Sequence, residues 1–199
     1  MLFDFPHTDT PQQMLEKFQV KELVEYERFC RDNALWEPML RCFAEDSQVE
    51  ISWYQGSGAG FVAASQNMKT RAPHKLNNTL VWLNGSRAAT VTMGCIQTRS
   101  QIGGQWMDLT SYVRFLYTLR RATGRWQIVT MNCIYEKDCL IPAWSELVGD
   151  QAPISRESYG NLARVLGAEG YTIAENLAGD DAPQITQALF ERANAWLRE

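Results

Sequence analysis

Apolar side chains recur at helical spacing in the first third of the chain. The pair Thr10-Pro11 is typical of a helix start, because proline is tolerated in the first turn, where its missing N–H is not needed. The apolar period continues to Asp32-Asn33 and predicts one helix with a single apolar face. The residues expected to face inward are Met14, Phe18, Leu23, Tyr26 and Cys30.

Two shorter helices and a strand are expected next. ALWEPMLRCFAED has Pro38 in its first turn and predicts a short helix, and VEISWY alternates as a strand does. After the glycine-rich segment QGSGAG, the stretch FVAASQNMKTR predicts a third helix capped by Ser57. Inward positions of the short helix are Trp36, Met39, Leu40 and Phe43, and the expected core residues are Trp36, Phe43, Trp53 and Phe61.

Four long strands follow. They are HKLNNTLVWLNG, SRAATVTMGCIQTR, WMDLTSYVRFLYTLRRA and GRWQIVTMNCIYEKD, and the breaks between them carry hairpin residues, among them Asn84-Gly85 and the glycine pair of SQIGGQ. This pattern predicts an antiparallel meander, and strands of this length must bend to close around a core. Alternation places Val113 with Phe115 on one face of the strand, and their hydrophobicity assigns that face to the inside, which leaves Asp108 and Arg114 on the outer face. The segment YEKD, residues 135–138, is expected to form a salt-bridge cluster at the end of a strand.

Two helices are expected after Pro142, in ISRESYGNLARVLGAEG and PQITQALFERANAWLRE. We interpret residues 1–11 as an N-terminal tail, 12–141 as the main domain and 142–199 as a helical extension that packs on the main domain or on a partner subunit. Helices segregated to one side of a curved antiparallel or mixed sheet define an α+β fold. Such a fold leaves a conical cavity that suits a small ligand.

Composition narrows the class of protein. The net charge is −4 in 199 residues, without a basic patch, which argues against a nucleic-acid partner. Five cysteines without a CxxC pair argue against zinc and indicate reduced thiols in the cytoplasm. The first residues lack the basic region of a secretory signal, and no apolar run approaches the roughly 18 residues of a membrane span. We therefore expect no metal, no membrane and a cytoplasmic location.

Four stretches resemble one family of proteins. They are FCRDNALWEPMLRCFAEDSQVEISW, GSGAGFVAASQNM, HKLNNTLVWLNGSRAATV and TGRWQIVTMNCIYEKD. They are similar to the SnoaL-like group of the nuclear-transport-factor-2-like superfamily, which also contains scytalone dehydratase. The resemblance extends over nearly the whole chain and implies a cone-shaped α+β fold. Because this fold hosts many activities, it implies much less about function.

The resemblance also implies a pair of catalytic residues. In scytalone dehydratase and in the related lindane dehydrochlorinase, an aspartate ending the first helix pairs with a histidine that begins the strand after the third helix. Asp32 and His74 match these positions. A carboxylate bound to one ring nitrogen fixes the tautomer, so that the other nitrogen is free to take a proton. The implied function is a cofactor-independent lyase or isomerase with His74 as general base and Asp32 as its orienting partner.

Departures from the family pattern narrow the range of expected substrates. A second histidine is missing from the site, since His7 precedes the first helix. The serine and asparagine of scytalone dehydratase correspond to Val113 and Phe115, and its tyrosine pair corresponds approximately to Arg31 and Trp53. We therefore expect a different substrate, a small, apolar, ring-containing molecule. Expected substrate-binding residues in the cavity are Tyr26, Trp53, Tyr54, Met93, Val113, Phe115 and Asn132.

Other interpretations stay open at this level. His74 is also explained as a residue that begins a strand and bonds to backbone. Two alternatives to the enzyme are a non-enzymatic small-molecule-binding protein and a structural subunit similar to the small subunit of ring-hydroxylating dioxygenases. We expect a homodimer or homotrimer, because the sheet has an apolar outer face to bury, with Trp82, Trp106 and Leu116 on it.

Overall fold

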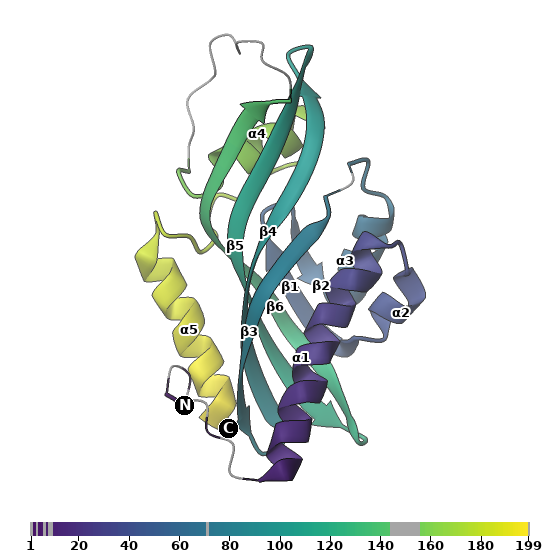
Figure 1. Ribbon diagram of the computed structural model, residues 1–199, viewed down its shortest axis with the longest axis vertical. Helices are drawn as coiled ribbons and strands as arrows, with labels where there is room; N and C mark the ends of the chain where they lie inside the picture. The colour runs from purple at the N-terminus through teal and green to yellow at the C-terminus, as the bar shows by residue number, and fades with distance from the viewer. Residues whose placement is uncertain are drawn as a thin grey trace.

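The computed structural model describes residues 10–70, 72–143 and 156–198, together with residues 2, 4, 5 and 7 (Figure 1). Its helices are α1 (Pro11–Asp32), α2 (Trp36–Leu40), α3 (Gly58–Gln66), α4 (Gly160–Ala168) and α5 (Pro183–Arg198). Its strands are β1 (Phe43–Ile51), β2 (Tyr54–Ser57), β3 (His74–Asn84), β4 (Arg87–Ile102), β5 (Gln105–Ala122) and β6 (Arg125–Pro142). The proposed division of the chain after residue 141 stays a prediction.

All six strands form one mixed sheet in the order β2-β1-β6-β5-β4-β3. The predicted meander of four long strands is confirmed, and β1 joins it by pairing parallel to β6. Gly103 and Gly104 both have positive φ in the two-residue turn between β4 and β5, a conformation that glycine adopts without strain. The pairing of β5 with β6 shifts register twice, with Val129 and Glu136 as the extra residues of β6, and the sheet curves strongly around its inner face (Figure 1).

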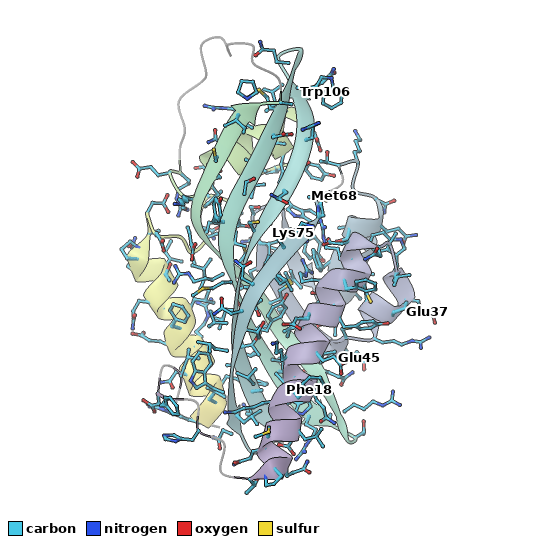
Figure 2. All side chains as sticks on the ribbon, in the orientation of Figure 1. Phe18, Glu37, Glu45, Met68, Lys75 and Trp106 are labelled. Carbon is cyan, nitrogen blue, oxygen red and sulfur yellow. The ribbon has the colours of Figure 1, made fainter. Side chains whose placement is uncertain are left out.

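Helix α1 has the predicted ends but a different buried face. Thr10 accepts a hydrogen bond from Gln13 N at 3.1 Å, and Gln13 accepts one from Thr10 N at 3.2 Å, which closes a capping box. The inward face predicted from apolar spacing was largely wrong: Met14 and Tyr26 are exposed, and Phe18, labelled in Figure 2, is 61% exposed. The buried residues of α1 are Glu16, Val20, Val24, Glu27, Arg28 and Cys30. Because the buried face of α1 carries charged residues, the spacing of its apolar residues predicted the wrong face.

Boundaries near α2 and α3 also differ from the prediction. Helix α2 ends at Leu40, which is exposed rather than inward, and Phe43 begins β1 instead of ending the helix. Helix α3 begins directly after its predicted cap, because the Ser57 side chain accepts from Gly60 N. Residues 144–155, part of the predicted extension, lie outside the described residues.

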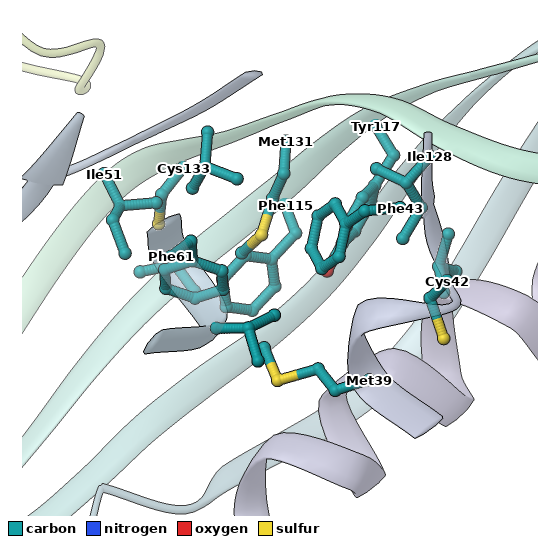
Figure 3. Packing of buried hydrophobic residues seen from close by; sticks show 14 of the residues in the cluster. Met39, Cys42, Phe43, Ile51, Phe61, Phe115, Tyr117, Ile128, Met131 and Cys133 are labelled. Carbon is teal, nitrogen blue, oxygen red and sulfur yellow. The ribbon is translucent and has the colours of Figure 1, made fainter. Parts of the chain in front are cut away.

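The main core lies between the inner face of the sheet and helices α1, α2 and α3. Phe43 and Phe61 are buried there as predicted, with ring centroids 6.2 Å apart, and Met39, Met131 and Cys133 pack around them (Figure 3). Val113 and Phe115 also face this core, as alternation along β5 predicts. Trp36 and Trp53 are partly buried at its edge.

Helix α5 covers part of the outer face of the sheet. Its buried residues Leu189, Ala193 and Leu197 form a second apolar cluster with Trp82 and Leu116. The expectation that another subunit covers these two residues is corrected, because the C-terminal helix of the same chain buries them. Trp106 lies farther along the sheet and is 42% exposed.

Helix α4 packs against β4, β5 and β6 at the other end of the sheet (Figure 1). Its residues Leu162 and Leu166 are buried in the main core. Asp138, at the end of the YEKD segment, accepts a hydrogen bond from Leu162 N at 2.8 Å and thereby caps the first turn of α4. Within YEKD, Glu136 forms an ion pair with Arg114, as predicted for a salt-bridge cluster. Helix α4 thus covers the inner face of the sheet at this end. None of the helices within the described ranges is long and apolar enough to cross a membrane.

Candidate functional site

His74 and Asp32 meet where the last residue of α1 lies beside the first residue of β3. His74 Nδ1 lies 2.8 Å from Asp32 Oδ1, and the backbone N of His74 donates to Asp32 Oδ2 at 2.7 Å. The side chains are 4% and 14% exposed. Because the carboxylate can only accept, Nδ1 carries the proton and Nε2 is the unprotonated nitrogen. The structure therefore brings together the two residues that the sequence singled out.

Arg28 lies on the other side of the histidine ring. Its Nη1 is 3.4 Å from His74 Nε2, a long contact in which the guanidinium is the donor. The remaining guanidinium edge binds Glu27, with Nε donating to Oε2 at 2.6 Å and Nη2 donating to Oε1. Phe61 and Phe115 lie against the guanidinium, with ring centroids 5.5 and 5.7 Å away. Glu27 and Arg28 are 0% and 3% exposed, so they form a buried ion pair.

Arg31 is a second buried guanidinium, with weaker partners. Its Nη1 lies 3.4 Å from Asp32 Oδ1 and 3.1 Å from the Ala72 carbonyl, and its Nη2 lies 3.1 Å from Met68 Sδ. Its side chain is 8% exposed. Asp32 Oδ1 already accepts from His74, so Arg31 shares an oxygen that is in use.

Burial and the two arginines decide the protonation state of His74. Desolvation lowers the pKa of His74 to about 3, and the charges of Arg31 and Arg28 act in the same direction against the hydrogen bond to Asp32. Burial alone would raise the pKa of Asp32, but the hydrogen bonds from the His74 ring and backbone and the charge of Arg31 bring it below its usual value. The histidine is therefore neutral and its aspartate is ionised.

The side chain of His74 lines a small enclosed space, which we call the inner pocket. Its volume is about 30 Å³, which is roughly the volume of one water molecule. The lining is mostly apolar and comprises Arg28, Arg31, Ile51, Ser52, Trp53, Met68, Ala72, His74, Ile96, Thr98, Phe115, Met131, Cys133, Tyr135, Leu162 and Leu166. Leu162 and Leu166 come from α4, so the C-terminal extension supplies part of its wall.

A second hollow of about 480 Å³, the outer pocket, adjoins the inner pocket. It is lined by residues 31–34, Trp36, residues 65–66, residues 68–70 and residues 72–73. Three residues, Arg31, Met68 and Ala72, line both pockets. These three residues therefore form the partition between the two spaces.

The predicted cavity residues divide into two groups. Trp53 and Phe115 line the inner pocket, Val113 is buried in the same core, and Tyr54 packs against Trp53. The prediction was wrong for three others, because the structure places Tyr26, Met93 and Asn132 away from the inner pocket. Tyr26 is on the exposed side of α1 and Met93 is exposed on β4. Asn132 lies on the outer face and donates to Glu50 at 2.7 Å, since alternation along β6 turns Met131 and Cys133 inward.

Glu27 and Arg28 were missed by the sequence analysis. Arg28 precedes Asp32 by four residues on a helix, a spacing that places two side chains on one face. That spacing would have identified Arg28 as a neighbour of the site. Cys133 also lines the inner pocket, but burial raises the pKa of its thiol to about 12, so it is not a thiolate at neutral pH. Within the described ranges, no three His, Cys, Asp or Glu side chains are placed to hold a metal ion.

Comparison with known proteins identifies the family. A SnoaL-like domain matches residues 12–132, more than half of the chain, so the chain belongs to the SnoaL-like family. It is 28% identical over 138 residues to Pea pathogenicity protein 2 of Fusarium vanettenii, covering 64% of this chain and 58% of that protein. The chain thus spans well under two thirds of the length of this relative.

Solved structures show the fold. A candidate scytalone dehydratase from Novosphingobium aromaticivorans has a TM-score of 0.55 at 14% identity, over 72% of this chain and 95% of that one. A type 2 hexachlorocyclohexane dehydrochlorinase has a TM-score of 0.56 at 11% identity, over 71% and 97% of the two chains. The predicted cone-shaped, nuclear-transport-factor-2-like α+β fold is confirmed.

Proposed function

We propose that this protein is a cofactor-independent lyase or isomerase that moves a proton on a small, ring-containing molecule. The observation that carries the proposal is the double hydrogen bond between His74 and Asp32. It fixes the ring with Nε2 as the unprotonated nitrogen of a side chain that lines the inner pocket. The competing interpretation as a passive binding protein would have His74 turned away from the pocket.

The chemistry requires only one base. His74 Nε2 takes a proton from a substrate carbon, and the electrons of that C–H bond form a new double bond. In a lyase reaction, a neighbouring group leaves with its bonding electrons, and a departing hydroxide takes the proton from His74 and becomes water. In an isomerisation, His74 returns the proton to a different carbon. Asp32 keeps the ring oriented and stabilises the imidazolium that forms.

The charges around the pocket favour an anionic intermediate. Glu27 and Asp32 offset Arg28 and Arg31 before the reaction, so an imidazolium formed alone would leave an excess positive charge. A negative charge that develops on a substrate oxygen at the same moment restores the balance, and the buried guanidiniums are placed to stabilise it. A substrate with a carbonyl next to the reacting carbon suits this arrangement.

A proton-exchange experiment tests the proposal. The full chain is incubated in D₂O with a panel of small cyclic ketones, and loss of the protons next to the carbonyl is followed by NMR. We expect His74→Gln to slow exchange by about 10²–10⁴-fold, and Asp32→Asn to slow it by a smaller factor. Asp46→Asn, which alters an exposed ion pair with Arg120, is the matched control. Exchange that is absent throughout, or unchanged in His74→Gln, would leave a binding protein as the better explanation.

A further inference from the structure

Arg31 lies in the partition between the outer pocket and the inner pocket. The other two residues of the partition, Met68 and Ala72, are its own hydrogen-bond acceptors at 3.1 Å each. Arg31 thus holds the wall that separates the wider hollow from His74. Both of these contacts are to neutral acceptors, one of them a thioether, which accepts weakly. A stronger acceptor in the outer pocket would compete for the same donors.

The two buried arginines differ in how their charges are balanced. Arg28 forms a close two-point pair with Glu27, whereas the only anion that Arg31 contacts in the described part of the chain is Asp32, at 3.4 Å and through an oxygen that His74 uses. Burial and the charge of Arg28 lower the pKa of Arg31 to about 10, so it remains a cation at neutral pH. A buried cation is stable only when paired, and the planar guanidinium fork fits a carboxylate through two parallel hydrogen bonds.

The outer pocket has an excess of positive charge. Besides Arg31, the charged residues of its lining in the described part of the chain are Lys69 and Asp32. Both oxygens of Asp32 are bonded to His74, so the carboxylate is already occupied. A small anion that enters the outer pocket therefore meets two cations and no free carboxylate of the lining. The lining also includes Trp36, which offers an aromatic surface next to these charges.

We propose that Arg31 binds the carboxylate group of the substrate and opens the partition as it does so. The substrate class is then a small, ring-containing carboxylic acid, whose ring passes the partition toward His74. This inference rests on the proposed function for the reaction at His74, and adds the anionic group and the route of entry. The inner pocket of about 30 Å³ is too small for a ring, so it must merge with the outer pocket to hold one.

Binding an anion at Arg31 also changes the base. Apart from burial, the charge of Arg31 is the largest influence that lowers the pKa of His74. Among the described residues, the other charged and titratable groups near the ring include Asp32, Arg28, Glu27, Tyr117, Cys133 and Tyr135. A carboxylate bound to Arg31 offsets the positive charge of Arg31, and this removes an influence that lowers the pKa of His74. The substrate itself would thus raise the basicity of His74 at the moment when a base is needed.

Binding of benzoate and of benzyl alcohol to the full chain, measured by isothermal titration calorimetry, tests the inference. The two probes share a ring and differ in charge. We expect the wild type to bind benzoate at least about tenfold more tightly, and Arg31→Gln to lose this preference. Arg31→Lys keeps the charge but not the fork, so it should keep part of the preference and carries the test if the glutamine variant does not fold. Arg41→Gln, which alters an exposed pair with Glu37, should behave as the wild type.

The variant His74→Gln separates this inference from the proposed function. Benzoate binding that depends on Arg31 and persists in His74→Gln supports the carboxylate site, whatever the exchange experiment finds. Equal affinity for the two probes, or a benzoate preference that survives in Arg31→Gln, overturns the carboxylate site. In that case, proton exchange of neutral ketones that depends on His74 would still support His74 as a base.

Discussion

At the scale of single residues, the site is a row of alternating charges around one neutral ring. Glu27, Arg28, His74, Asp32 and Arg31 contact one another in this order, and all are largely buried. Interactions of this kind are strong because the surroundings have a low dielectric constant, and a missing member leaves its neighbour uncompensated. The stability of the protein should therefore depend on the same residues as its chemistry.

Acid should destabilise the protein through His74. The folded-state pKa of about 3 lies below the ordinary 6.5, so between these values only the unfolded chain binds the proton, and stability falls as the pH falls. At pH 4.5 the loss is roughly 2–3 kcal/mol relative to pH 7. Urea unfolding at both pH values should show this loss in the wild type and not in His74→Gln. His7→Gln, at an exposed histidine, should lose as much as the wild type. Equal losses in all three proteins would show that His74 is not the group involved.

Removing Glu27 should be costly. Glu27→Ala leaves Arg28 as a buried, unpaired cation, and we expect a loss of about 3–5 kcal/mol in the free energy of unfolding. The double variant Glu27→Ala, Arg28→Met removes both charges and should recover part of the loss. Glu37→Ala breaks an exposed pair with Arg41 and should cost no more than about 1 kcal/mol. Denaturant unfolding of the three variants measures these differences, and similar losses for the two single variants would contradict a buried ion pair.

The sequence predicted part of this site and missed the rest for a definite reason. Asp32 and His74 were found because a resemblance supplied both positions. Glu27 and Arg28 were not, because hydrophobic periodicity assigns charged residues to the outside of a helix. Here the charged pair occupies the inner face, and Met14, Phe18 and Tyr26 lie outside. Charged residues that are buried can be recognised only when their partners across the core are known, and the sequence of one helix does not give those partners.

At the scale of elements, α4 joins the site to the C-terminal extension. Leu162 and Leu166 line the inner pocket, yet the N-cap residue Tyr159 offers no side-chain bond to the first turn. Asp138 of β6 takes over that role by accepting from Leu162 N. This hydrogen bond ties the first turn of α4 to β6, in addition to the burial of Leu162 and Leu166 in the core.

Substituting Asp138 should loosen α4. Asp138→Ala removes the cap and its favourable charge at a helix N-terminus, a loss of about 1 kcal/mol. Hydrogen–deuterium exchange followed by mass spectrometry should be faster in residues 160–168 and unchanged in β3. Asp46→Ala, at an exposed pair far along the chain, is the control. If exchange in α4 matched the wild type, Asp138 would not be its main attachment.

Strand and helix boundaries differ in how well sequence predicts them. The turns around Gly85, Gly103 and Gly124 were located because each needs a residue that tolerates positive φ. The boundary between α2 and β1 was not, because a short apolar segment suits a helix or a strand equally well. Phe43 enters the sheet because it pairs with Ile128 of β6, a partner far away in the sequence.

At the scale of the whole molecule, α5 replaces a contact that was expected from another subunit. Trp82 and Leu116 are covered within the chain, so any oligomer must use a different surface or displace this helix. The extension therefore has two structural roles: α4 closes the inner side of the cone, and α5 covers the outer side.

Disturbing α5 should make the protein self-associate. Leu189→Asp places a charge in the outer cluster and should release the helix, which exposes the apolar face of the sheet. Light scattering during size-exclusion chromatography should then show a larger mass than for the wild type at the same concentration. Ala188→Asp puts the same charge on the exposed side of α5 and should leave the mass unchanged. A Leu189→Asp protein of unchanged mass would show that α5 is not needed to shield the sheet.

The parallel pairing of β1 with β6 determines when the site can form during synthesis. Val49 and Met131 are paired across about 80 residues of chain, so β1 leaves the ribosome long before its partner. The hairpins from β3 to β6 close locally and are expected to form first, because short loops close faster than long ones. Until β6 is complete, β1 has only the short β2 to pair with, and α1 can pack on α2 and β3 but not on β6. The inner pocket takes Met131, Cys133 and Tyr135 from β6, so it is still incomplete around His74 at that stage.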